Sequence, residues 1–158
     1  MPMYRVMLEN LQLLPLLPRF NLRHRFGEDS VDQVCRDHGV NTEFFLEIAN
    51  AYLDDMYVPG EGLSLFPLKT MVDYISSTHT YYTEFAIPLV EEKIHRLMEH
   101  SRLSEKEVLL VTNFFNDYKE DFMDHLAQEE EEILPYVLEL EQQAALDVPD
   151  PDFLLKLQ

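Results

Sequence analysis

A long run of helical periodicity in the second half constrains the fold of this chain more than any other feature. Apolar residues recur every three or four positions from Val108 to Leu140, which predicts an amphipathic helix with one buried face. Extending the pattern places Glu129 on that face, one turn after His125. Because an unpaired carboxylate is costly to bury, Glu129 is expected to need a cation or several hydrogen-bond donors.

The pairing of His125 with Glu129 admits two interpretations. A histidine and a glutamate one turn apart can clamp one metal ion, or one arm of a two-metal site. In the plainer alternative, Glu129 begins a solvated acidic run that continues to Glu132, and His125 lies at its boundary. Neither interpretation needs a nucleophile, and no Gly-rich phosphate loop or Ser–His–Asp pattern is visible, so no catalytic or cofactor-binding residue is predicted.

Composition narrows the class of protein. The chain has 158 residues, 46% of them hydrophobic, which allows one or two small domains with a core. Its single cysteine, Cys35, excludes an internal disulfide and a Cys-cluster metal site within one chain. Because it lies on a short predicted helix among apolar neighbours, Cys35 is expected to be a buried, unreactive thiol. The net charge is −18, of which residues 1–55 carry −4 and residues 56–158 carry −14. Such a field repels nucleic acid and anionic membranes, so neither partner is expected.

We expect a cytoplasmic protein, since no signal peptide and no membrane-spanning apolar run is recognisable. The long periodic segments and only four glycines predict an all-α fold. Its first part, residues 1–55, is expected to be a small three-helix module. One helix covers 5–17 and ends around Pro15 and Pro18, and a second has a capping box of Ser30 and Gln33 and stops at Gly39. The third begins at Asn41 or Thr42 and runs to residue 53.

A linker over 56–66 is expected to lead into a long helical hairpin over 67–143, followed by a tail over 144–158. Pro67 suits the first turn of the hairpin, Pro88 is expected to kink its first arm, and Ser104 with Glu107 forms a capping box for the second. The turn lies at 101–103. The apolar stripe of the first arm contains Val72, Ile75, His79, Tyr82, Ala86, Leu89 and Leu97.

The hairpin provides a geometric argument for a metal site. His79 and His125 lie almost the same number of residues from the turn, so at about 1.5 Å per residue they are expected at the same level. Both lie on stripes predicted to face inward, and Glu129 is one turn away. The sequence therefore predicts one metal site formed by His79, His125 and Glu129. His100 lies about 31 Å along the helix from His79, so it is expected to be a helix-end residue only.

Two segments of the hairpin resemble a known family. Thr78–Tyr82 with Ile87–Pro88, and His125-Leu-Ala-Gln-Glu129 with Ile133-Leu-Pro135, resemble the hemerythrin-like domain of the RIC (repair of iron centres) di-iron proteins. Residues 30–46 resemble the helical domain that precedes it. The resemblance implies half of a hemerythrin-like four-helix bundle and iron as the cofactor. It also implies repair of, or response to, oxidative or nitrosative damage, with iron–sulfur proteins as clients.

The chain departs from that family in two ways. Where the family carries Cys-Cys-Gly-Gly, residues 25–28 read Arg-Phe-Gly-Glu. The family's di-iron site also uses two hairpins, each with two histidines and one glutamate, and no histidine follows His125 here. The chain is then a fragment of a longer protein, a homodimer that combines two half-sites into a di-iron site, or a metal-free relative. Because each arm of the hairpin carries a wide apolar stripe and a layer of two helices leaves much of it exposed, we predict a homodimer. The expected function is an iron protein in repair; the alternatives are a module that senses or binds oxygen, nitric oxide or iron, and a metal-free helical interaction domain.

Overall fold

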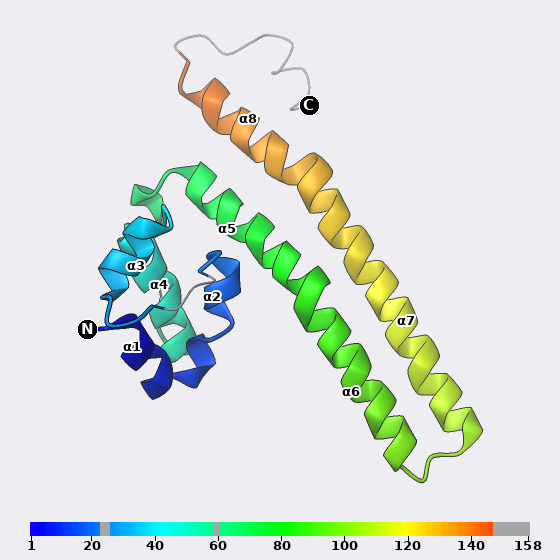
Figure 1. Ribbon diagram of the computed structural model, residues 1–158. Coiled ribbons are helices and arrows are strands. Elements are labelled where there is room, and N and C mark those ends of the chain that lie inside the picture. The colour runs from blue at the N-terminus through cyan, green and yellow to red at the C-terminus, as the bar shows by residue number, and fades with distance from the viewer. Residues whose placement is uncertain (23–25, 59–60, 147–158) are drawn as a thin grey trace. The chain divides into compact units, whose positions relative to one another are not determined.

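The computed structural model describes residues 1–22, 26–58 and 61–146, and this part of the chain consists of helices and connections with no strand, as predicted for an all-α protein. The chain divides into two compact units, residues 1–81 and 82–158 (Figure 1). Each unit is described by itself below. Most of the expected tail, residues 147–158, lies outside the described residues.

The first unit begins with three short helical segments, so the single helix predicted over 5–17 is wrong. They are α1 (Met3–Glu9), the 3-10 turn η1 (Leu11–Leu13) and α2 (Leu16–Arg19). The break occurs at Asn10, whose φ of −138° leaves the helix and whose side-chain Nδ2 donates to the Val6 carbonyl at 3.0 Å. An asparagine bonded to the last turn competes with continued helix, which the apolar pattern alone does not reveal. Pro15 then precedes α2.

Two further helices of this unit begin at the predicted caps. Ahead of α3 (Val31–Asp37), the Ser30 hydroxyl accepts a hydrogen bond from the Gln33 N–H, and ahead of α4 (Thr42–Leu53) the Asn41 side chain accepts one from the Phe44 N–H. Gly39, between them, has a φ of +69°, which glycine adopts without a steric penalty. These local signals were sufficient to place both helices.

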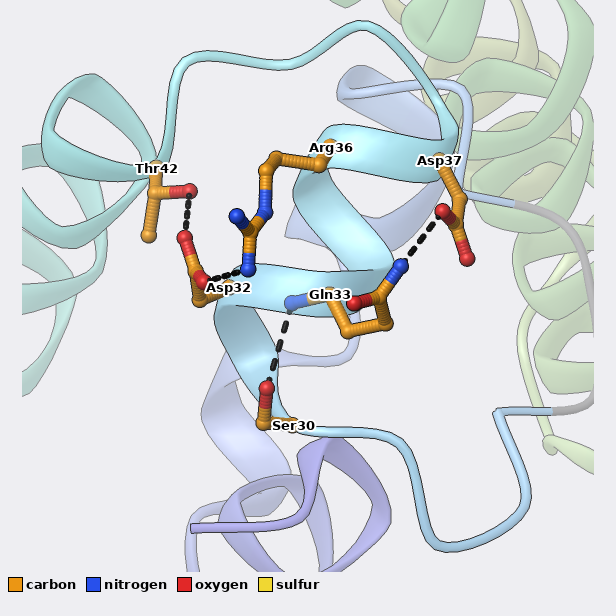
Figure 2. Close-up of polar contacts among 6 residues, drawn as sticks. All are labelled: Ser30, Asp32, Gln33, Arg36, Asp37 and Thr42. Atoms are coloured by element: carbon orange, nitrogen blue, oxygen red, sulfur yellow. Dashed lines mark hydrogen bonds and ion pairs between the residues drawn. The ribbon is translucent and has the colours of Figure 1, made fainter.

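The predicted capping box at Ser30 is only half formed, as Figure 2 shows. The Gln33 side chain donates to Asp37 at 2.7 Å rather than returning to the Ser30 backbone. Asp32 pairs with Arg36 and accepts a hydrogen bond from the Thr42 hydroxyl at 3.1 Å. The side chains of α3 therefore bond along the exposed side of the helix and to the start of α4.

The core of the first unit includes residues from α5 (Leu68–Tyr81), which lies beyond the expected linker. The Phe20 ring contacts the rings of Phe44, Phe45 and Tyr74 at centroid distances of 5.9, 5.1 and 4.7 Å. The unit therefore extends to Tyr81 rather than ending within 56–66. In the expected linker region, residues 61–65 form a 3-10 turn, η2 (Glu61–Leu65), and residues 59–60 lie outside the described part.

The second unit is built on an antiparallel pair of helices, α6 and α7, that lie side by side in Figure 1. Its elements are the π-helical turn η3 (Tyr82–Ala86), α6 (Ile87–His100), α7 (Glu105–Gln128), a second π-helical turn η4 (Glu129–Ile133) and α8 (Leu134–Ala144). The complete capping box predicted for Ser104 and Glu107 is present, and its hydrogen bonds lower the pKa of the Glu107 carboxyl. An ion pair between Lys119 and Glu91, 2.9 Å long, sets the register of α6 against α7.

Both π-turns end two residues before a proline, at Pro88 and at Pro135. A proline lacks the N–H that would bond to the carbonyl four residues earlier, and its ring clashes with that carbonyl. The carbonyls concerned belong to Glu84 and Glu131, each inside a π-turn, so the wider turn accommodates the proline. The sequence predicted a disturbance at Pro88 but an uninterrupted helix across Pro135.

The π-turns shift the apolar stripe by one residue, which corrects the predicted stripes beyond each turn. Ile87 and Leu134 are buried, whereas Leu89, Leu97 and Ile133, predicted to face inward, are exposed. A π-turn adds one residue to the helix, so every later side chain rotates by about 100°. Which residues are buried beyond each π-turn therefore depends on the position of that turn and not on the helical period before it.

This register predicts unequal effects for two neighbouring substitutions. Ile87→Ala should lower the free energy of unfolding by about 2–4 kcal/mol, because it leaves a cavity between packed helices. Leu89→Ala, at an exposed position, should lower it by less than about 1 kcal/mol. Urea unfolding followed by circular dichroism measures both. Equal losses, or a larger loss for Leu89→Ala, would show that the stripe is not shifted.

Candidate metal site

The candidate site is centred on His125, in the last turn of α7, and Glu129, the first residue of η4. Their nearest side-chain atoms, His125 Nε2 and Glu129 Oε1, lie 3.3 Å apart. A neutral imidazole nitrogen and a carboxylate oxygen at this separation can both bind one metal ion. The pair is thus a two-donor chelate held on one side of a helix.

The exposure of this pair differs from the sequence prediction. The Glu129 side chain is 28% exposed and the His125 side chain 60% exposed, although both were expected to face inward. On the helical wheel, His125 lies about 80° from Phe115, at the flank of the α6–α7 seam rather than in its centre. The pair is therefore accessible from solvent.

His79, the third predicted ligand, lies in α5 and is buried, with 8% of its surface exposed. It belongs to the first unit, whereas His125 and Glu129 belong to the second. In the described part of the chain, no three His, Cys, Asp or Glu side chains are grouped so that they could hold a metal ion. The pair fits one arm of a metal site, and the three-residue site stays a prediction.

The remaining histidines have other roles or lie elsewhere. His100 ends α6, and its Nδ1 lies 2.8 Å from the Arg96 carbonyl, as expected for a helix-end histidine. His95 is exposed. His38 Nδ1 lies 2.8 Å from the Val34 carbonyl in the first unit, and His24 is outside the described residues. None of these supplies a further donor beside His125.

A concave pocket in the first unit contains a buried arginine that the sequence did not single out. The pocket lies between α2, the α3–α4 connection and α5, with Arg19, His38 and Asp73 among its lining residues. The Arg19 guanidinium bonds to the Tyr52 hydroxyl and lies over the rings of Tyr52 and Tyr81, 5.4 and 5.0 Å from their centroids. These contacts compensate the buried charge, so Arg19 holds α2 against α4 and α5.

A further feature is an exposed apolar surface on the α6–α7 pair, called the open face below, which two helices with wide apolar stripes were expected to leave uncovered. It consists of Val90 and Leu97 of α6 and of Leu110, Phe114 and Tyr118 of α7, all of them exposed. The neighbours Phe114 and Phe115 illustrate the width of the apolar surface: Phe115 is buried, and Phe114 is exposed beside it.

Comparisons with models of known families, with curated proteins and with solved structures gave no match for this chain. The helices of the described residues also include none with the length and apolar character that crossing a membrane requires. The geometry of the second unit and the sequence resemblance therefore remain the basis for a functional proposal.

Cys35 is fully buried in the first unit, as predicted, and its environment gives a testable pH dependence. Burial raises the pKa of its thiol from 9.0 to about 11, helped by the charge of Asp32 and opposed by a hydrogen bond from Thr42. The thiolate is then absent at neutral pH, so the folded protein should react negligibly with thiol reagents.

The same shift predicts a loss of stability in alkali. The raised pKa means that the unfolded state loses the Cys35 proton at lower pH than the folded state, so the contribution is present below pH 9 and lost towards pH 11. Its size is at most about 2–3 kcal/mol. Unfolding free energies of the wild type and of Cys35→Ala, measured from pH 8 to 11, should converge as the pH rises. A difference in unfolding free energy that stays constant from pH 8 to 11 would show that the pKa of Cys35 is not raised in the folded protein.

Proposed function

We propose that this chain is an iron-binding, hemerythrin-like protein that acts in repair of, or response to, oxidative or nitrosative damage to iron–sulfur centres. The observation that carries the metal part is the 3.3 Å approach of His125 Nε2 to Glu129 Oε1. The repair role is supported by the resemblance of the His125–Pro135 segment and of residues 30–46 to the RIC proteins.

The predicted ligands would supply nitrogen and carboxylate donors to such a site. His125 supplies a neutral nitrogen donor, and Glu129 supplies a carboxylate that offsets part of the charge of a ferrous ion. In the predicted site, His79 adds a second imidazole. Bound iron supplies the redox chemistry. Because His125 is largely exposed, a small ligand or a client protein can approach the pair directly.

The charge of the second unit supports attraction of metal cations. Residues 82–146 contain sixteen acidic and five basic residues, with four consecutive glutamates beginning at Glu129. A surface of one sign raises the local concentration of ions of the opposite sign. The same field disfavours nucleic acid, so the proposed clients are iron–sulfur proteins. Recovery of a damaged iron–sulfur enzyme on addition of the iron-loaded chain separates repair from passive binding or sensing.

The open face favours one alternative, a metal-free helical interaction domain. Exposed apolar residues of this number on one hairpin are typical of a surface that contacts another protein. In that case the His125–Glu129 contact is an exposed helical pair, which adds less than about 1 kcal/mol to stability. Metal content distinguishes this alternative from the iron proposal.

Iron binding should depend on the predicted ligands and not on other histidines. After anaerobic loading with ferrous iron and desalting, His125→Ala, Glu129→Ala and His79→Ala should each retain at least about tenfold less iron than the wild type. His100→Ala is the matched control, since His100 Nδ1 lies 2.8 Å from the Arg96 carbonyl at the end of its own helix. Metal analysis and the absorption spectrum report the loading. Equal retention in all four variants would refute the site.

A further inference from the structure

We propose that the open face of α6 and α7 is an interface for a second copy of this chain, which brings two His125–Glu129 pairs to the same level of one four-helix bundle. This inference deepens the proposed function, because it names the partner that completes the metal site. It rests on the position of the exposed apolar residues, on their alignment with His125 and on the register of α6 against α7.

On α7, the open face and the candidate site lie along one line of the helix. Leu110, Phe114 and Tyr118 are spaced four residues apart, and His125 follows two turns later on the same side. Glu129 continues the line at the start of η4. A protein that covers Phe114 and Tyr118 with a helix long enough to continue along α7 therefore also covers His125 and Glu129.

On α6, Val90 and Leu97 face the same side of the hairpin. At about 100° per residue around the helix axis, Val90 and Leu97 lie about 60° and 80° from the buried Ile87. On α7, Tyr118 and Phe114 lie about 60° and 100° from the buried Phe115, rotated in the same sense about their own helix axis. Because α6 and α7 face each other and run in opposite directions, equal rotation in the same sense turns both sets towards one side. The exposed apolar residues of the two helices thus form one continuous face.

A second copy fits this face better than an unrelated helix, because it supplies both a matching apolar face and a second His125–Glu129 pair. A two-fold axis parallel to the helices keeps every residue at the level of its equivalent, so Phe114 and Tyr118 would pack against the same apolar layers in the partner. The two His125–Glu129 pairs would then lie at one level. Together they offer four donors, whereas the pair of a single chain offers two of the four that a closed metal site takes.

Charge supports the same arrangement at the edge of the face. The ion pair of Glu91 with Lys119 shows the register of α6 against α7. Lys93, two residues further along α6, is therefore level with Asp117, two residues back along α7. Since α6 of one copy lies against α7 of the other in such a bundle, Lys93 faces the partner's Asp117.

The test compares two adjacent leucines in the 158-residue chain. Leu110→Glu places a charge in the open face, whereas Leu109→Glu places the same charge at an equally accessible position about 100° away; the two leucines are 71% and 60% exposed. Sedimentation velocity across a dilution series, with and without ferrous iron, measures dimer dissociation. Leu110→Glu should raise the dissociation constant at least about 100-fold, and Leu109→Glu less than about threefold.

The outcomes separate the interface from the iron function. A wild-type dimer that only Leu110→Glu disrupts supports the interface, even if the protein retains no iron and the proposed function fails. A wild-type chain that remains monomeric at high concentration overturns the interface, even if it binds iron. Equal effects of the two glutamates also overturn it, because the contact would then not involve the open face.

Discussion

The second unit depends on one constraint: two helices packed side by side can bury only the seam between them. In α6 and α7 that seam contains Ile87 and Phe115, and the apolar surface of both helices extends beyond it. A layer of two helices has no second layer to cover the rest. The exposure of Phe114 has this origin, so the open face is a consequence of the packing arrangement.

The two prolines determine how the helices present their side chains within that arrangement. Pro88 and Pro135 each follow a π-turn, and each turn moves the buried line of its helix by one residue. The second π-turn begins at Glu129 itself, so the carboxylate lies where the helix widens. π-Turns are frequent at functional sites because they change the direction of a side chain without breaking the helix. The His125–Glu129 pair itself keeps α-helical geometry, since the Glu129 N–H bonds the His125 carbonyl, and the widening affects the residues after it.

The sequence predicted what local chemistry controls. The all-α class, the caps at Ser30, Asn41 and Ser104, the left-handed glycine at Gly39 and the buried Cys35 were all correct, because each depends on residues close in sequence. The break at Asn10 was missed, since an apolar period does not report that a polar side chain can end a helix. The burial of Arg19 was missed because it depends on Tyr52 and Tyr81, which are distant in the chain.

The candidate site was predictable only in part. The spacing of His125 and Glu129 on one helix follows from four-residue periodicity, and the structure brings their donor atoms together. Their exposure did not follow, because it depends on which helices cover α7. The convergence of His79 with them stays a prediction for the same reason, since it requires the arrangement of two units rather than the pattern of one helix.

The central claim is that the His125–Glu129 pair is half of an iron site that a second copy completes. The most direct measurement is the dimer dissociation constant of the wild-type chain, obtained by sedimentation velocity in a chelator and again after ferrous iron is restored. Because iron would bind the assembled state more tightly than the separate chains, chelation should weaken the dimer and iron should recover it. An identical dissociation constant in both conditions would show that the dimer is not built around metal.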